Sequence, residues 1–420
     1  MDLQGKRVAY ITLGCKLNFS ETSTIRRDLE RAGTVSVGEE EEAEIVVINT
    51  CSVTDMAEKK GRQVIRKIAR RSPGARVVVV GCYAQLRGEE LRAIEGVHLV
   101  LGADEKFSVA DRLRGRQGRL PCDAPGLERF DPACSYGDRT RGFLKIQDGC
   151  DYSCSYCTIP GARGKSRSAS IQQVMEMARE AAGSGVKEII LTGVNTGDFG
   201  RRSGETFLDL LQALDRMEGG AERYRVSSIE PNLLTGEIID FVASSRRFMP
   251  HFHVPLQSGS DEVLALMGRR YTRDLFADRV ERARARIPDV FIGVDVIAGM
   301  RGETDELFEE SLRFISGLAV SRLHVFPYSE RSGTRALSIP RVVPVVERRR
   351  RVEALLAVSD EKIAGFYRRF EGHTRPVLFE EGDGPSRGFT DNYIRVVLPR
   401  DPSLVNRIEP VRLEASNMEF

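Results

Sequence analysis

The first third of the chain alternates short, continuous apolar runs with longer segments in which apolar residues recur at helical spacing. The apolar runs cover residues 7–13, 44–48 and 76–80, and the helical segments cover residues 20–31 and 54–71. The third run is almost entirely valine, which is expected of a strand that is buried on both faces. The alternation predicts a parallel, doubly wound α/β sheet.

The middle of the chain repeats a strand-then-helix pattern six times between residues 142 and 370. Ser170, with Gln173 three residues later, has the spacing of a capping box at the start of the first of these helices. The pattern predicts an open (β/α) barrel whose active face lies at the carboxyl ends of the strands. The six candidate strands cover residues 143–147, 188–192, 224–229, 252–256, 291–297 and 322–326.

Residues 371–420 have a different character. Residues 374–380 and 393–398 alternate as strands and are separated by Gly382-Asp383-Gly384-Pro385. This predicts a small all-β module that carries six arginines. These arginines are Arg375, Arg387, Arg395, Arg400, Arg407 and Arg412.

Two other segments have no strong pattern. A helix that opens with Arg348-Arg349-Arg350-Arg351 runs to about Phe370, and its arginines fit a solvated helix face at least as well as an RNA contact. Residues 116–141 are rich in glycine, proline and charge, which predicts a linker. Cys122 and Cys134 lie in that linker, and we interpret both as thiols without a ligand role.

Composition narrows the class of protein. The chain has 420 residues, enough for two or three domains, and its 41% hydrophobic content suits a soluble globular protein. The polar start and the lack of an apolar run of membrane length predict no secretion signal and no membrane segment. Eight cysteines in such a chain indicate a reducing cytoplasm and metal ligation. The net charge of only +2 points to no partner by itself.

Cys150, Cys154 and Cys157 have the spacing C-x3-C-x2-C. Three thiolates on one short loop can hold three irons of a cubane [4Fe-4S] cluster and leave the fourth iron open to a small molecule. A helix with buried cysteines is the plain alternative, but Gly149 and Pro160 make a poor helix here. Nothing else indicates a secreted disulfide protein, and no nearby residue completes a four-ligand zinc site.

Cys15, Cys51 and Cys82 each follow one of the three apolar runs of the first domain. Because the carboxyl ends of parallel strands meet at one edge of a sheet, these three thiols are expected to converge there. Three unrelated buried cysteines are the alternative. Gly14 and Gly81, each directly before a cysteine, favour a sharp backbone turn around a bound group.

Polar residues also gather at the ends of the predicted barrel strands. Taken singly, Asn195, Glu230, Gln257 and Asp295 are more often turn or cap residues than ligands, but their shared position fits a binding site equally well. His251 and His253 alternate on one predicted strand, so they can share a face. We favour core or supporting roles over metal binding for this pair.

These motifs resemble the radical S-adenosylmethionine methylthiotransferase family. The resemblance is carried by the string from Lys145 to Pro160, with Tyr156 before the last cysteine, and by Arg163-Gly164-Lys165-Ser166-Arg167-Ser168. It extends to Gly14-Cys15-Lys16-x-Asn18-x-x-Glu21-Thr22, Asn49-Thr50-Cys51 and Gly81-Cys82-Tyr83-Ala84-Gln85. It covers nearly the whole chain.

The resemblance implies an enzyme with two [4Fe-4S] clusters. The cluster held by Cys150, Cys154 and Cys157 would bind S-adenosylmethionine, and the cluster held by Cys15, Cys51 and Cys82 would carry the sulfur to be transferred. No catalytic side chain is assigned. The residues implied to line the cofactor pocket are Tyr156, Asn195, Glu230, Gln257 and Asp295.

It also implies a domain order and partners. Residues 5–116 would form the methylthiotransferase amino-terminal domain, residues 136–368 the radical S-adenosylmethionine core, and residues 371–420 a TRAM-like RNA-binding domain. Phe389 and Tyr393 of the last domain are candidates for stacking on unpaired bases. The implied partners are tRNA, an electron donor such as flavodoxin or ferredoxin, and a sulfur donor.

Within the family, the motif Gly14-Cys15-Lys16-x-Asn18-x-x-Glu21-Thr22 and the string Tyr328-Ser329-Glu330-Arg331-Ser332-Gly333-Thr334 resemble the branch that acts on N6-threonylcarbamoyladenosine in tRNA. The product would be the 2-methylthio derivative, beside the anticodon. Sister enzymes that act on isopentenyladenosine or on a ribosomal-protein aspartate are alternatives, as is a non-catalytic iron–sulfur RNA-binding protein. One departure is Met300-Arg301, where the family usually has Phe-Pro.

Overall fold

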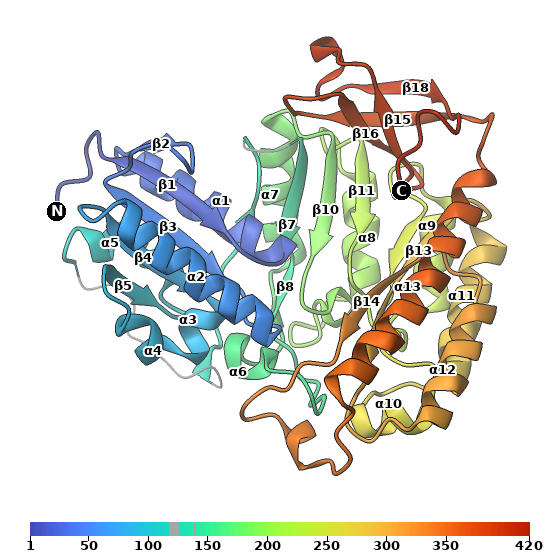
Figure 1. Cartoon of the computed structure of the whole chain (residues 1–420). Helices are drawn as coiled ribbons and strands as arrows, with labels where there is room; N and C mark the ends of the chain where they lie inside the picture. Colours follow the sequence, from blue (N-terminus) through green and yellow to red (C-terminus); the bar gives the residue numbers. More distant parts are fainter. Residues whose placement is uncertain (117–125, 138–139) are drawn as a thin grey trace.

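The computed structural model of the chain describes residues 1–116, 126–137 and 140–420. Three units follow one another in it (Figure 1): an α/β domain drawn in blue, a barrel drawn from green to orange, and a small red β module at one end of the barrel. Cys122 lies outside the described residues. In the described part, no helix is both long enough and apolar enough to cross a membrane.

The amino-terminal domain is a parallel five-stranded sheet with the order β2-β1-β3-β4-β5. Leu29 of one helix and Ile65 of another lie in two separate apolar cores, on opposite faces of the sheet, which confirms the doubly wound prediction. The strands are β1 (Arg7–Thr12), β2 (Val35–Val37), β3 (Ile45–Thr50), β4 (Arg76–Gly81) and β5 (Val97–Leu101). The helices are α1 (Lys16–Arg31), α2 (Asp55–Arg71), α3 (Cys82–Leu86), α4 (Gly88–Arg92) and α5 (Val109–Leu113).

Helix α1 begins at Lys16, four residues before the predicted start at residue 20. Its first turns bury polar residues, Asn18, Ser20 and Glu21 among them, so they lack the apolar periodicity that marks a helix. Strands β2 and β5 were not predicted, because both are partly exposed edge strands without a continuous apolar run.

The central unit is an open barrel in two halves. Strands β7 (Arg141–Lys145), β10 (Glu188–Thr192) and β11 (Arg223–Val226) pair in parallel, as do β12 (His251–His253), β13 (Phe291–Ala298) and β14 (Arg322–Pro327). Parallel bridges Tyr224–Phe248 and Ser228–His253 join the halves. The six-strand open barrel was therefore predicted correctly, including the capping box of Ser170 and Gln173.

Helices surround this barrel, and short elements complete it. The longer helices are α7 (Ile171–Gly183), α8 (Phe207–Arg216), α9 (Gly236–Ser244), α11 (Arg273–Arg286), α12 (Asp305–Gly317) and α13 (Val345–Arg368). The short elements are α6 (Ile159–Arg163), α10 (Asp261–Met267), β8 (Gln147–Asp148) and β9 (Arg167–Ser168). Part of the predicted linker is also a strand, β6 (Ala133–Cys134), which pairs antiparallel with β7 and buries Cys134.

The carboxyl-terminal unit is an antiparallel sheet of β15 (Thr374–Glu380), β16 (Ser386–Thr390), β17 (Arg395–Leu398) and β18 (Ile408–Arg412), in the order β17-β16-β15-β18. The all-β prediction is confirmed, although β16 and β18 lack a clear apolar alternation and were not predicted. Tyr393 contacts His251 and Phe291 of the barrel, with ring centroids 4.6 and 5.3 Å away. Its expected role in stacking on RNA bases is wrong, because the ring joins the module to the barrel.

The arginines at the start of α13 are only partly on a surface. Arg348 donates to the Tyr328 carbonyl at 3.0 Å and to Glu330 at 2.8 Å, and Arg351 donates to Glu303 at 2.7 Å. Both are buried, whereas Arg349 and Arg350 are exposed. The four-arginine run is therefore neither a solvated face nor an RNA surface as a whole, because half of it holds the barrel end together.

The departure at Met300-Arg301 has a structural explanation. Met300 is fully buried, and Arg301 donates to Glu330 at 3.0 Å and to the carbonyls of Leu337 and Ile339 at 2.8 and 3.2 Å. The arginine therefore fastens this loop to the segment that follows β14, on the side where that segment meets the amino-terminal domain.

The junction between barrel and β module provides a stability test. Arg225 is buried, pairs with Glu188 at 2.9 Å and donates to the Asp391 carbonyl at 3.0 Å. Arg225→Met should lower the free energy of unfolding by about 3 kcal/mol, because it leaves a buried carboxylate with one partner fewer. Lys187→Met, in the exposed pair with Glu222, should change it by less than about 1 kcal/mol. Urea titration measures both, and equal effects would contradict the assignment.

Candidate active site

A cavity of ≈ 440 Å³ lies at the carboxyl ends of the barrel strands, where the barrel meets the amino-terminal domain. Its volume is in the range of small-molecule sites. Every cofactor-pocket residue expected from the sequence lines it, together with four of the six expected cysteine ligands. Those residues are Tyr156, Asn195, Glu230, Gln257, Asp295, Cys15, Cys150, Cys154 and Cys157.

The loop of the three clustered cysteines is anchored at Gly149. This glycine has a φ of 69°, and a Cβ there would lie 2.1 Å from the Lys165 carbonyl oxygen. The N–H of Cys150 donates to the Gly164 carbonyl at 3.0 Å, and the Gln147 amide donates to the Gly149 carbonyl at 2.8 Å. The loop is therefore held against the segment that follows α6, with no room for a side chain at its first turn.

Each of the three thiols receives a hydrogen-bond donor. The N–H groups of Tyr152 and Ile159 donate to the sulfurs of Cys150 and Cys157, both at 3.4 Å, and Arg269 donates to Cys154 at 3.2 Å. Burial raises the pKa of Cys150 and of Cys157 to about 12. Ligation therefore has to displace protons from these thiols, which iron can do.

The donor set fits a cluster better than a single ion. Among the described residues, no three His, Cys, Asp or Glu side chains are placed to hold one metal ion. A cubane cluster takes one thiolate at each of three separate irons, so its ligand sulfurs do not converge on one point. Three thiols from one loop, each with its own donor, fit that requirement.

Arg269 was not predicted from the sequence. It pairs with Glu230 and donates to the hydroxyls of Tyr271 at 3.0 Å and Tyr156 at 3.4 Å, in addition to Cys154. Burial raises the pKa of Glu230, and Arg269 opposes that effect. Arg269 follows α10 outside any motif, so no sequence signal could have found it.

Three buried polar atoms of residues that line this cavity have no hydrogen-bond partner among the described residues. They are the amide nitrogen of Asn195, the hydroxyl of Tyr328 and the Nε of Arg331. Buried polar atoms of this kind are normally satisfied, so these three are available to a bound polar molecule. Gln257 has a φ of 69°, an uncommon conformation for a residue with a side chain, and such conformations concentrate at functional sites.

The two histidines of β12 contact different neighbours. His253 contacts Asp295 at 2.8 Å; burial would raise the pKa of Asp295, but this contact and the His253 charge bring it below its ordinary value. His251 stacks on Phe291, and burial holds its pKa well below the ordinary range. Neither histidine belongs to a three-ligand metal group among the described residues.

The second group of cysteines gathers where strands β1, β3 and β4 end. Cys51 and Cys82 are buried and Cys15 is exposed toward the cavity. Burial and the charges of the other two thiols raise the pKa of Cys51 to about 12. A Cβ at Gly14 would lie 2.7 Å from that of Cys51, so the glycine allows the two cysteine segments to meet.

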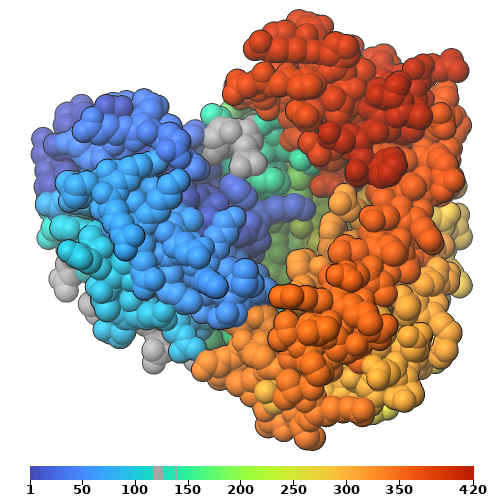
Figure 2. Space-filling view, viewed as in Figure 1, coloured from blue at the N-terminus to red at the C-terminus, as the bar shows by residue number. Residues whose placement is uncertain are grey.

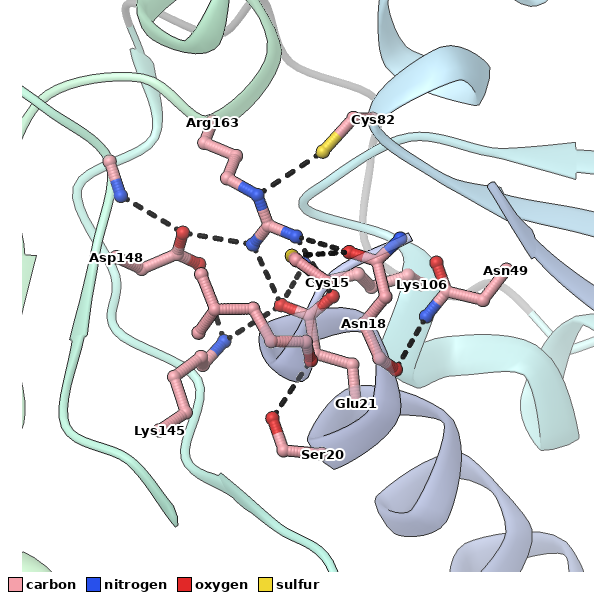
Figure 3. Close-up of polar contacts among 12 residues, drawn as sticks. Cys15, Asn18, Ser20, Glu21, Asn49, Cys82, Lys106, Lys145, Asp148 and Arg163 are labelled. Carbon is pink, nitrogen blue, oxygen red and sulfur yellow. Dashed lines mark hydrogen bonds and ion pairs between the residues drawn. The ribbon is translucent and has the colours of Figure 1, made fainter. Parts of the chain in front are cut away.

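One arginine of the core reaches this second group (Figure 3). Arg163, at the end of α6, donates to the Cys82 sulfur at 3.2 Å, to Glu21 at 2.9 Å, to Asp148 at 3.0 Å and to the Asn18 side-chain oxygen at 2.9 Å. The Cys15 thiol donates to the same Asn18 oxygen at 3.6 Å. Arg163 therefore connects both thiols with the barrel.

Lys16 directly follows Cys15 and starts α1. Burial lowers its pKa, and the groups whose charges act on it are Tyr393, Arg141, Arg225 and Asp295, all from the barrel or its β module. In the part of the chain that the structure describes, its amino group makes no hydrogen bond or ion pair. Figure 2 shows a hollow between the blue domain, the red module and the orange side of the barrel.

Two family descriptions match the chain. The Radical SAM superfamily matches residues 144–315, and the Uncharacterized protein family UPF0004 matches residues 7–102. Among solved structures, the radical S-adenosylmethionine methyltransferase TsrM from Kitasatospora setae, with cobalamin and a [4Fe-4S] cluster bound, matches with a TM-score of 0.56 at 16% identity, over 77% of this chain and 75% of that one. At this identity the match concerns the fold.

Curated relatives match almost the whole chain. The threonylcarbamoyladenosine tRNA methylthiotransferase MtaB of Bacillus subtilis is 38% identical over 97% of this chain and 93% of its own. MtaB of Thermotoga maritima is 35% identical over 93% and 91%. The tRNA-2-methylthio-N(6)-dimethylallyladenosine synthase of Syntrophotalea carbinolica is 31% identical over 96% and 95%. With this similarity over nearly its full length, the chain belongs to the radical S-adenosylmethionine tRNA methylthiotransferase family.

Proposed function

We propose that this enzyme adds a methylthio group to carbon 2 of N6-threonylcarbamoyladenosine, next to the anticodon of tRNA. The observation that carries the proposal is the shared cavity: Cys15 lines it from the amino-terminal domain, and Cys154 lines it from the barrel. When bound, S-adenosylmethionine and two [4Fe-4S] clusters supply the radical and the sulfur. The protein places the radical source and the sulfur source in the same cavity.

The ligand assignment follows the two thiol groups. Cys150, Cys154 and Cys157 hold the cluster on the barrel side, and Cys15, Cys51 and Cys82 hold the other. The side chains assigned to the cofactor are Tyr156, Asn195, Glu230, Gln257 and Asp295. The side-chain nitrogen of Asn195, which has no hydrogen-bond partner among the described residues, supports this assignment. Arg269 holds Tyr156 and Cys154 by hydrogen bonds.

The choice of substrate within the family rests on charge. The threonylcarbamoyl group ends in a carboxylate, whereas the dimethylallyl group of the sister substrate is apolar. Lys16, which directly follows Cys15 and starts α1, is a half-buried cation whose amino group makes no hydrogen bond or ion pair among the described residues, so a substrate carboxylate could pair with it. An apolar substituent there would leave the amino group unpaired.

The remaining partners and boundaries are part of the same proposal. The domains cover residues 5–116, 136–368 and 371–420, and the last binds tRNA. Arg387 and Arg395, which line a surface hollow of this module, are the contacts proposed there, because the Phe389 ring stacks on Tyr393 and lies under the Arg141 guanidinium. A flavodoxin or ferredoxin supplies electrons, a separate donor supplies sulfur, and the cytoplasm is the location.

The first test concerns the clusters. Anaerobically reconstituted protein should bind about eight irons, four for each cubane. Replacing Cys150, Cys154 and Cys157 by alanine, or Cys15, Cys51 and Cys82 by alanine, should each leave about half. Only the second variant should still cleave S-adenosylmethionine to deoxyadenosine. Iron analysis and product counting in one reaction measure this, and full iron in either variant rules out the assignment.

The second test concerns the substrate. In a strain that lacks the native gene, this chain should restore the 2-methylthio derivative of N6-threonylcarbamoyladenosine in hydrolysed tRNA. It should not produce the 2-methylthio derivative of isopentenyladenosine. Mass spectrometry of nucleosides separates the two masses. Appearance of only the second nucleoside, or of methylthiolated ribosomal protein, would assign the enzyme to a sister branch.

The third test concerns Lys16. Lys16→Met should weaken binding of tRNA that carries the threonylcarbamoyl group by about tenfold or more, since a charge-assisted hydrogen bond contributes about 1.5–3 kcal/mol. Binding of the same tRNA without that group should change little. Lys59→Met, on the exposed side of α2, is the matched control. An equal loss for both tRNAs would show that Lys16 contacts the tRNA backbone instead.

A further inference from the structure

A buried group of charges lies between the amino-terminal domain and the barrel. It consists of four cations and two carboxylates, and none of the six residues is more than 9% exposed. Glu21 and Lys106 come from the amino-terminal domain, and the others come from the barrel; Figure 3 labels all of them except Arg167. We call these residues the junction charges: Glu21, Lys106, Lys145, Asp148, Arg163 and Arg167.

The junction charges do not balance. Among the described residues, every ion pair of the four cations goes to Glu21 or Asp148, which leaves an excess of two positive charges. The ring of Phe107 lies 5.5 Å from the Lys106 amino group and 5.3 Å from that of Lys145, but such contacts offset only part of the cost of burial. Buried charge without a counter-charge is strongly unfavourable.

Arg163 brings part of this excess positive charge into contact with the second cysteine group. All five N–H donors of this guanidinium are directed at acceptors, and one of them is the Cys82 sulfur at 3.2 Å. A [4Fe-4S]²⁺ core with three thiolate ligands carries one net negative charge. A bound group of that charge at Cys15, Cys51 and Cys82 would therefore supply much of the missing counter-charge.

We propose that the junction charges form an electrostatic seat for the cluster of the amino-terminal domain, with Arg163 as the residue that positions Cys82 and fastens the two domains once the cluster is bound. The inference rests on the proposed assignment of Cys15, Cys51 and Cys82 as ligands. It follows that the contact between the amino-terminal domain and the barrel is fully stable only when this cluster is bound. The seat also makes the cluster easier to reduce, because buried positive charge favours the more negative state.

Arg163 can be replaced without leaving a buried carboxylate unpaired, because the junction charges contain more cations than carboxylates. Without it, Glu21 keeps Lys106 at 2.7 Å and Lys145 at 3.2 Å, and Asp148 keeps Lys145 and Arg167, both at 3.3 Å. No buried carboxylate is left unpaired, so Arg163→Met is expected to fold. Lys106→Met provides a second variant that removes charge without touching a cysteine.

The experiment uses the full chain with Cys150, Cys154 and Cys157 replaced by alanine, so that only the amino-terminal cluster remains. Four variants are made in it: Arg163→Met, Arg163→Lys, Lys106→Met and Arg27→Met. Arg27 is the matched control, because it links α1 to the Cys134 carbonyl at 2.6 Å and touches no ligand thiol. Cluster potential is measured by redox titration with EPR detection, and cluster retention by the rate of iron loss to a chelator.

Arg163→Met should lose iron about tenfold faster, as is usual when an outer hydrogen bond to a metal ligand is removed, and its potential should shift to more negative values. Arg163→Lys should keep the potential near that of the parent but still lose iron faster, because it keeps the charge and loses the planar fork. Lys106→Met should shift the potential in the same direction with little effect on iron loss. Arg27→Met should change neither.

Hydrogen exchange tests the fastening of the domains. Loading with iron should slow exchange in α1 of the parent chain, and Arg163→Met should remove that gain. Unchanged potentials in Arg163→Met and Lys106→Met, with iron bound as tightly as in the parent, would overturn the seat. A parent chain that binds no iron at all would instead overturn the ligand assignment on which the seat rests.

Discussion

The buried guanidinium of Arg163 connects the two larger domains, with hydrogen bonds to four different side chains. It comes from α6, directly after the first cysteine loop, and it bonds to α1, to β8 and to Cys82 at the start of α3. Because its planar fork fixes several acceptors at once, it sets their relative positions more tightly than a lysine could. Ile159, at the start of the same helix, lines the cavity between the domains.

The two cysteine groups are held by similar means. In each, one arginine donates to one cysteine sulfur at 3.2 Å: Arg163 to Cys82 and Arg269 to Cys154. The two arginines differ in their surroundings. Arg269 is balanced by Glu230, whereas Arg163 lies in a group with more cations than carboxylates. The two sites therefore present different electrostatic environments to the groups they hold.

Much of the chain's basic charge serves structure rather than RNA. Arg225 joins the barrel to the β module, and Arg351 binds the start of α13 to Glu303. Arg375 of the module pairs with Asp391 at 2.7 Å. Composition cannot separate these arginines from a binding surface, because a buried ion pair and an exposed patch use the same residue type. This is why the four-arginine run at the start of α13 was misread as one surface.

The sequence by itself determined the chain of elements and the residues of the site. Buried parallel strands require continuous apolar runs, and the cysteines directly after three of these runs had to meet at one sheet edge, where Cys15, Cys51 and Cys82 are found. The polar residues at the barrel strand ends lie in one cavity for the same reason. Local pattern is enough for such features, because strand direction alone fixes which ends coincide.

Only the tertiary structure decided that Arg269, which lies outside every motif, and Arg163, which lies within one, contact the cysteines. Arg269 reaches Cys154 across 115 positions of sequence, and Arg163 reaches Cys82 across 81. Such contacts leave no periodic signal, because a single charged residue has the same local sequence whether it is buried or exposed. The same holds for Tyr393, whose ring was expected on the surface and lies against the barrel. Its position is set by how two folded units pack, and no short stretch of sequence contains that information.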